Sequence, residues 1–230
     1  MNLINKNNFT YIKKKIIQAA QRSGRRPEDI QLVAITKRFP VFAIQQAYNN
    51  DILCIGESRI QESENKLKDL SIRNKLEVHL IGHLQSNKAR KAIQLYDVIE
   101  TVDTIKLAKK ISSISSEIKK AQKIYLQVNS GQDPLKKGFS LNEIEKAALE
   151  IAQMKNLIIG GIMMIPPFIE MDNNYRKIYS STRELRDKLL ALGINSCKDL
   201  SMGMSRDYEM AIEEGATHIR IGTALFGQRP

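Results

Sequence analysis

The sequence predicts an α/β fold: a single (β/α)8 TIM barrel with an extra N-terminal helix, in one domain that spans residues 1–230. Eight short runs rich in Ile, Val and Leu alternate with stretches of helical periodicity. The length of 230 residues is close to the roughly 250 residues typical of such a barrel. No glycine-rich nucleotide fingerprint follows the first apolar run, which argues against an open doubly wound sheet.

The apolar runs predict the strands. They lie at residues 32–36, 52–55, 77–81, 98–101, 124–128, 157–162, 199–201 and 218–221. These runs are mostly apolar on both faces, which is typical of a parallel sheet covered by helices. In a closed barrel the first and last strands are neighbours, so their carboxyl ends share the rim at which the sites of such barrels lie.

Segments with helical periodicity lie between the predicted strands. They cover residues 41–48, 59–70, 87–95, 104–119, 141–154, 174–192 and 205–213. Ser140 with Glu143 fits a capping box before one helix, and Gly193 and Gly215 follow helices as C-terminal stops. A further helix at residues 11–22 precedes the first strand. We expect it to cover the place where a helix after the eighth strand would lie.

Composition limits the class of protein. The formal net charge is +11, but the lysines are scattered among Asp and Glu without interleaved aromatic residues, so no nucleic-acid partner is expected. No apolar stretch approaches the roughly 18 residues that span a bilayer, and the N-terminus lacks the apolar segment of a signal peptide. Cys54 and Cys197 are too few for a disulfide framework. We expect a cytoplasmic protein with no membrane partner.

The residues that follow the first and the last predicted strand together predict a ligand. Lys37 directly follows the first strand, where desolvation favours the neutral amine that attacks an aldehyde. Gly222 and Thr223 directly follow the last strand and can hold a phosphate through backbone N–H groups and a hydroxyl. One small molecule that carries an aldehyde and a phosphate is pyridoxal 5′-phosphate (PLP). We therefore expect PLP as the cofactor.

Arg220 shares a strand face with Gly222, because side chains two residues apart point to the same side. A guanidinium stays charged inside the rim and needs an acceptor there. The pyridine nitrogen of PLP is one candidate. An ion pair with Asp207 or Glu57 is the other.

The end of the seventh strand adds a serine to this rim. Ser201 precedes a glycine-containing turn that leads into a helix, and loops after the seventh and eighth strands commonly bind phosphate in barrels. Ser201 is therefore a candidate for phosphate binding. Ser205 is interpreted as an ordinary helix cap.

Four segments together resemble a known family. They are residues 34–37, 79–88, 200–207 and 220–227. The chain is similar, over residues 32–227, to the alanine-racemase-like, PLP-binding proteins of PLP homeostasis, the YggS and proline synthase co-transcribed homologue family. The resemblance implies a monomeric barrel that holds PLP as a Schiff base on Lys37. It also implies that the pyridine nitrogen lies near Arg220, with the phosphate around Ser201, Gly222 and Thr223.

The same resemblance implies that Asn129 and Met163, at the ends of the fifth and sixth strands, line the pocket. Ser58 stands where the family has an asparagine beside the cofactor. Arg59 replaces an aromatic residue of the family and adds a charge near the rim.

The function we expect is that of a carrier or regulator of PLP, with PLP-dependent apo-enzymes as recipients and no catalytic residues. An arginine at the pyridine nitrogen keeps that nitrogen unprotonated, which weakens the ring as an electron sink. Alanine racemase continues into a second domain that supplies a further base, whereas this chain ends at Pro230. The alternative is a small PLP-dependent amino-acid racemase.

The histidines do not predict a metal site. His79 and His83 are four residues apart, but they lie in a strand followed by a turn and would not share a face. No carboxylate or third ligand is spaced along the sequence to join them.

Overall fold

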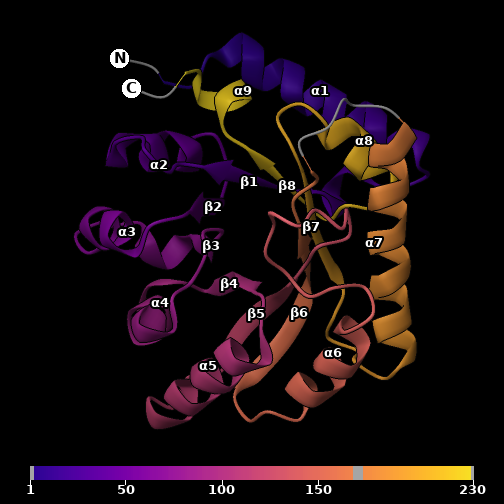
Figure 1. The fold of residues 1–230 in the computed structure, drawn as a ribbon. Helices are drawn as coiled ribbons and strands as arrows, with labels where there is room; N and C mark the ends of the chain where they lie inside the picture. The colour runs from indigo at the N-terminus through magenta and orange to yellow at the C-terminus, as the bar shows by residue number, and fades with distance from the viewer. Residues whose placement is uncertain (1–2, 168–172, 229–230) are drawn as a thin grey trace.

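The computed structural model describes residues 3–167 and 173–228. In these residues, eight parallel strands close into a barrel in the order of the sequence (Figure 1). They are β1 (Gln31–Ile35), β2 (Cys54–Glu57), β3 (Glu77–Leu80), β4 (Val98–Val102), β5 (Gln122–Val128), β6 (Leu157–Met164), β7 (Asp199–Met204) and β8 (His218–Ile221). The predicted fold class is confirmed.

Helices surround the barrel (Figure 1). The described residues form α1 (Lys6–Arg22), α2 (Val41–Tyr48), α3 (Ile60–Leu67), α4 (Ala89–Leu95), α5 (Ile105–Glu117), α6 (Ile144–Ala152), α7 (Asn173–Ala191), α8 (Tyr208–Glu213) and the single-turn α9 (Thr223–Phe226). As expected, α1 packs against α8 and α9, beside the end of the last strand. Within the described part of the chain, no helix combines the length and the apolar character needed to cross a membrane.

The seam between β1 and β8 joins the two ends of the chain. Val33 pairs with Arg220 and Ala34 pairs with Ile221, both in parallel register. A Cβ atom added to Gly222 would lie 3.4 Å from the Cβ of Ile35. The residues that directly follow β1 and β8 therefore meet at one rim of the barrel.

The two faces of the sheet differ in character. The outward residues pack with the helices in one large apolar cluster, and examples from the strands are Ala34, Ile55, Val78, Ile99, Leu126, Ile162, Leu200 and Ile219. Among the described residues, the inward face holds two small apolar clusters. One contains Val33, Ile35 and Cys54, and the other contains Val98, Tyr125 and Met163.

Most of the remaining inward positions are polar and buried, among them His79, Glu100, Ser201, His218 and Arg220. The prediction that the strands are mostly apolar on both faces is therefore wrong for the inner face. Buried polar side chains persist there because they hydrogen-bond to one another. The sequence carries a signal for this, since β3 and β8 both alternate polar and apolar residues.

Candidate cofactor-binding site

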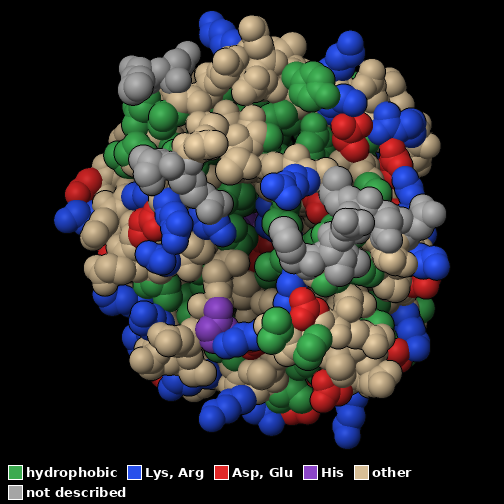
Figure 2. Space-filling model, turned by 45° about the horizontal axis from the view of Figure 1, so that its top comes forward, with side chains coloured by type: hydrophobic (Ala, Val, Ile, Leu, Met, Phe, Trp, Pro, Cys, Tyr) green, Lys and Arg blue, Asp and Glu red, His purple; other side chains and the backbone are tan. Residues whose placement is uncertain are grey.

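A cavity of about 820 Å³ opens at the rim formed by the carboxyl ends of the strands. Its walls come from the ends of β1, β6, β7 and β8, from the segments that follow them, and from Ile81 and Lys136 in the segments after β3 and β5. Figure 2 shows this face of the molecule, where the surface is hollowed near its centre and Lys and Arg side chains lie around the hollow. This is the rim at which the sequence predicts a site.

Five of the eight predicted site residues line the cavity: Lys37, Met163, Arg220, Gly222 and Thr223. Ser58, Asn129 and Ser201 are not among its lining residues. Lys136 and Ser205 are among the lining residues that the prediction did not include.

Lys37 is half-buried and follows a fully buried threonine. The Thr36 hydroxyl donates a hydrogen bond to Glu57 Oε1 at 2.7 Å, and the Thr36 carbonyl accepts one from Lys66 Nζ at 2.9 Å. Lys66 Nζ also donates to Glu57 Oε1 at 2.8 Å. The backbone directly before Lys37 is thereby fixed to β2 and α3.

Burial raises the pKa of the Glu57 carboxyl, and the charge of Lys66 and its hydrogen bond oppose that rise. Glu57 is fully buried, and its second oxygen has no hydrogen-bond partner among the described residues. Lys66 is thus the group that neutralises this carboxylate. The prediction that Glu57 could pair with Arg220 is wrong.

The backbone directly after Lys37 is also anchored. The Arg38 N–H donates to Glu62 Oε1 at 2.5 Å, and the same oxygen accepts from Lys66 Nζ at 2.6 Å. Arg38 has a backbone φ of 65°, which lies in the left-handed region that residues other than glycine rarely adopt. Such a conformation persists where neighbouring contacts determine it. Lys37 therefore extends from a turn held on both sides.

Arg220 lies on the cavity floor and is only 5% exposed. Its guanidinium donates to Ser201 Oγ at 2.7 Å and to the Met164 carbonyl at 2.7 Å. Glu100 Oε2 lies 3.8 Å away and is the acidic partner of Arg220. The alternative prediction of a pair with Asp207 is also wrong, because Asp207 accepts from the backbone N–H of Met204.

Ser201 lies beneath the cavity and is fully buried. Its hydroxyl donates to Glu100 Oε2 at 2.6 Å while it accepts from Arg220. Both of its hydrogen-bonding roles are thus used inside the barrel. The predicted contact between Ser201 and a phosphate remains a prediction, and this position makes Ser201 a residue that orients Arg220.

Glu100 connects this arginine to the centre of the barrel. His79 Nδ1 lies 2.5 Å from Glu100 Oε1, and both side chains are fully buried. Burial alone would raise the pKa of Glu100. The hydrogen bond from His79 and the charges of His79 and Arg220 hold it below the usual range instead. The charge of Arg220 is therefore balanced by an ionised carboxylate.

Ser205 is a site residue that the sequence did not predict. Helix α8 begins at Tyr208 with Asp207 as its N-cap, so the interpretation of Ser205 as a helix cap is wrong. Ser205 Oγ lies 3.4 Å from Thr223 Oγ1 and accepts from the Ala224 N–H at 3.4 Å. The available signal was its position at the end of β7, because parallel pairing brings that end beside the end of β8.

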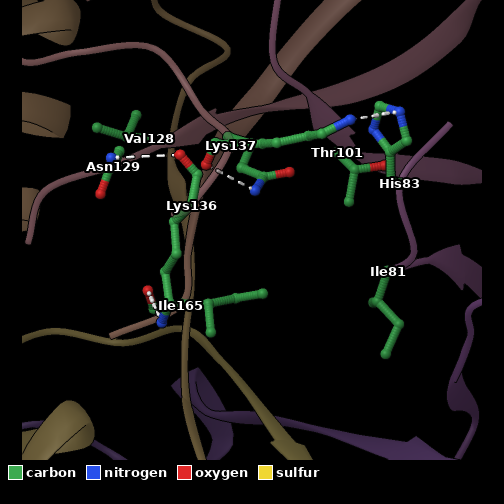
Figure 3. Close-up of a pocket in the computed structure, with 9 residues that line it drawn as sticks. Ile81, His83, Thr101, Val128, Asn129, Lys136, Lys137 and Ile165 are labelled. Atoms are coloured by element: carbon green, nitrogen blue, oxygen red, sulfur yellow. Dashed lines mark hydrogen bonds between the residues drawn. The ribbon is translucent and has the colours of Figure 1, made fainter. Parts of the chain in front are cut away.

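Asn129 lies at a smaller neighbouring cavity of about 240 Å³ (Figure 3). Its side-chain amide donates to the Asp133 carbonyl at 2.8 Å, and its oxygen accepts from the Asp133 N–H at 3.1 Å. Lys136 lines both cavities, and its ammonium binds the carbonyls of Ile165 and Pro166. Asn129 therefore shapes the loop that carries Lys136 between the two cavities.

Ser58 is half-buried and follows β2. Its backbone approaches Gly82 so closely that a Cβ atom on that glycine would lie 2.1 Å from the Ser58 carbonyl oxygen. Arg59, which follows it, is exposed and directly precedes α3. The predicted role of Ser58 beside the cofactor remains a prediction.

The fold and this rim define a class of protein: parallel (β/α)8 barrels that present one lysine, one buried arginine and a group of small polar residues to a single cavity. The family model of the alanine racemase N-terminal domain matches residues 12–230. The chain belongs to this family, and the resemblance predicted from the sequence is confirmed.

Individual relatives agree over nearly the whole chain. A pyridoxal phosphate homeostasis protein of Aquifex aeolicus is 37% identical over 219 residues, which are 94% of each chain. The structure of a protein of unknown function from Bifidobacterium adolescentis has a TM-score of 0.92 at 31% identity and covers 98% of this chain and 100% of its own. PipY of Synechococcus elongatus, solved with PLP bound, has a TM-score of 0.82 at 34% identity and covers 94% and 100%.

Replacing Lys66 by alanine leaves the Glu57 carboxylate buried without its cation. We expect Lys66→Ala to lower the free energy of unfolding by about 3–5 kcal/mol, measured by denaturant titration at pH 7. Because burial raises the pKa of Glu57, this deficit shrinks as the pH falls and the carboxyl takes up a proton. Lys68→Ala on the exposed side of the same segment is the control and should change stability by less than about 0.5 kcal/mol. Equal effects of the two substitutions on stability would contradict the assignment of Lys66 as the cation that neutralises Glu57.

Proposed function

We propose that this protein binds PLP covalently through Lys37 and acts in PLP homeostasis as a carrier or regulator of the cofactor. The observation that carries the proposal is the convergence of Lys37, Arg220 and the Ser205–Thr223 pair on one cavity. These groups lie on segments that are far apart in the sequence. The close pairing of β1 with β8 brings them to one rim.

The cavity fits the cofactor in size and chemistry. Its volume of about 820 Å³ lies within the range of roughly 300–1,000 Å³ that small-molecule sites occupy. Bound PLP would supply an electrophilic aldehyde and an aromatic ring that accepts electrons. Lys37 would bind the aldehyde, while Ser205, Gly222 and Thr223 would hold the phosphate. The PLP-bound structure of PipY, a relative of 34% identity, supports this choice of ligand.

Arg220 favours retention of the cofactor over catalysis. Its guanidinium is held in the barrel by contacts with Ser201, Glu100 and the Met164 carbonyl. Beside the pyridine nitrogen it would oppose protonation of that nitrogen, because two adjacent positive charges repel. An unprotonated ring stabilises a carbanion poorly.

The relatives are named for homeostasis and not for a reaction, which supports the carrier over an enzyme. PLP-dependent apo-enzymes are the recipients that such a carrier implies. Closure of the barrel by strands from both ends of the sequence supports one domain for the whole chain.

Covalent attachment identifies the binding lysine. Protein loaded with PLP and reduced with borohydride should carry one phosphopyridoxyl group, and peptide mapping by mass spectrometry should place it on Lys37. Lys37→Ala should lose this label and the absorbance of the bound cofactor. Lys136→Ala, which removes another lysine of the same cavity, should keep both. A label on a lysine other than Lys37 in the wild-type protein would refute the proposal.

The phosphate assignment rests on Ser205. A hydrogen bond to a charged group is worth about 1.5 kcal/mol or more, so Ser205→Ala should weaken PLP binding roughly tenfold. Binding of pyridoxal, which has no phosphate, should remain unchanged, as fluorescence titration with both ligands would show. Ser113→Ala serves as the comparison, since Ser113 is an exposed serine of α5 that does not line the cavity. If Ser205→Ala weakens both ligands equally, Ser205 does not contact the phosphate.

A carrier should not turn over amino acids. The loaded protein, incubated with a panel of amino acids in deuterium oxide, should incorporate deuterium at Cα no faster than free PLP does, measured by NMR. Sustained exchange well above that rate, lost in Lys37→Ala, would establish the alternative of a small PLP-dependent racemase.

A further inference from the structure

A second group of chemically reactive side chains lies at the opposite end of the barrel from the cofactor cavity. Cys54 begins β2 and Glu77 begins β3, and the parallel register pairs these two residues directly. His79 lies two residues beyond Glu77 and therefore on the same face. One ligand atom from each of the three lies within 4.8 Å of the others.

The histidine is oriented as a metal ligand is. His79 is fully buried, and its Nδ1 lies 2.5 Å from the carboxylate of Glu100, which is also fully buried. A carboxylate on Nδ1 holds one proton there, so a metal ion that binds Nε2 has only the second proton of the charged imidazole to displace. Metal-binding histidines almost always have such a partner on their second nitrogen.

His79 Nε2 has no hydrogen-bond partner among the described residues, although it is buried. Buried polar atoms without a partner are rare, and each calls for a structural explanation. Nε2 lies 3.6 Å from Glu77 Oε1, and Cys54 Sγ is the third member of the same group. A ligand between these atoms would satisfy Nε2.

The spacing suits a tetrahedral ion. Ligand bonds of about 2.0–2.3 Å in a tetrahedron separate neighbouring ligand atoms by roughly 3.3–3.8 Å. The distance between His79 Nε2 and Glu77 Oε1 already lies in this range. The Glu77 side chain is 43% exposed, so an ion can enter from solvent at this end of the barrel. Lys123 pairs more closely with Asp199 at 2.9 Å than with Glu77 at 3.9 Å.

We propose that Cys54 Sγ, His79 Nε2 and the Glu77 carboxylate bind one divalent transition-metal ion of the zinc class, with a fourth position open to water. A thiolate and an imidazole select zinc-like ions over Mg²⁺ and Ca²⁺, which prefer oxygen ligands. On binding, the Cys54 thiol and His79 Nε2 each release a proton to solvent and form a bond to the metal. Glu100 is a positioning residue that orients His79.

The sequence analysis did not predict this group, because the spacing of the histidines draws attention only to His79 and His83. Cys54 and Glu77 are far apart in the sequence and become neighbours through the pairing of β2 with β3. The group uses neither Lys37 nor any other residue of the cofactor cavity. Metal binding can therefore be tested whether or not the protein carries PLP.

Cobalt(II) serves as the probe, because its absorption reports both coordination number and thiolate binding. Protein freed of metal by a chelator and kept reduced should bind one Co²⁺ per chain. The spectrum should show the intense visible bands of a tetrahedral ion and a charge-transfer band from thiolate to cobalt, and Zn²⁺ should displace both. A wild-type protein that shows no thiolate band at excess Co²⁺ would overturn the proposal.

Variants separate the site from general effects on folding, which circular dichroism monitors. Cys54→Ser should lose the charge-transfer band, whereas Cys197→Ser, a change of the other buried cysteine, should keep it. Glu77→Gln, at a partly exposed position that tolerates substitution, should retain the band but weaken binding at least tenfold. Glu100→Gln should weaken binding about 10–100-fold through His79. The same cobalt spectrum and affinity in Cys54→Ser and Cys197→Ser would refute the site.

Discussion

Hydrogen bonding between β1 and β8 closes the sheet, and the register of this seam places Val33 beside Arg220 and Ala34 beside Ile221. Every functional feature of the rim follows from this register. It sets the turn that carries Lys37 next to the segment that begins at Gly222. A shift by one residue would turn the inward side chains of β8 toward the helices, because the side-chain period of a strand is two.

The inner face of the barrel is polar, which is costly unless each group finds a partner. Arg220, Ser201, Glu100 and the Nδ1 atom of His79 satisfy this condition as one chain of contacts that runs from the cavity at the rim toward the other end of the barrel. Such a network gives little net stability, since desolvation of the charges offsets their attraction. Its benefit is geometric. The guanidinium is held in one orientation at the floor of the cavity.

The rim combines a turn that is fixed by hydrogen bonds with a lysine side chain that extends from it. The Thr36–Glu57–Lys66 contacts and the Arg38–Glu62 contact fix the turn that carries Lys37, while Lys37 itself extends into the cavity. Small polar groups at Ser205 and Thr223 line the same cavity. The cavity thus combines a lysine fixed at its base with an arginine fixed on the floor.

The sequence by itself determined the α/β class, the number of strands and the positions of Lys37, Gly222 and Thr223, because hydrophobic periodicity and turn residues are local signals. Tertiary structure decided which strand face points inward and which residues meet across strands. An irregularity in the pairing of β7 with β8 leaves Ser201 inside the barrel and brings Ser205 to the rim. The Lys66–Glu57 pair and the Cys54–Glu77–His79 group likewise arise only when separate segments are packed together, and no local pattern encodes that proximity.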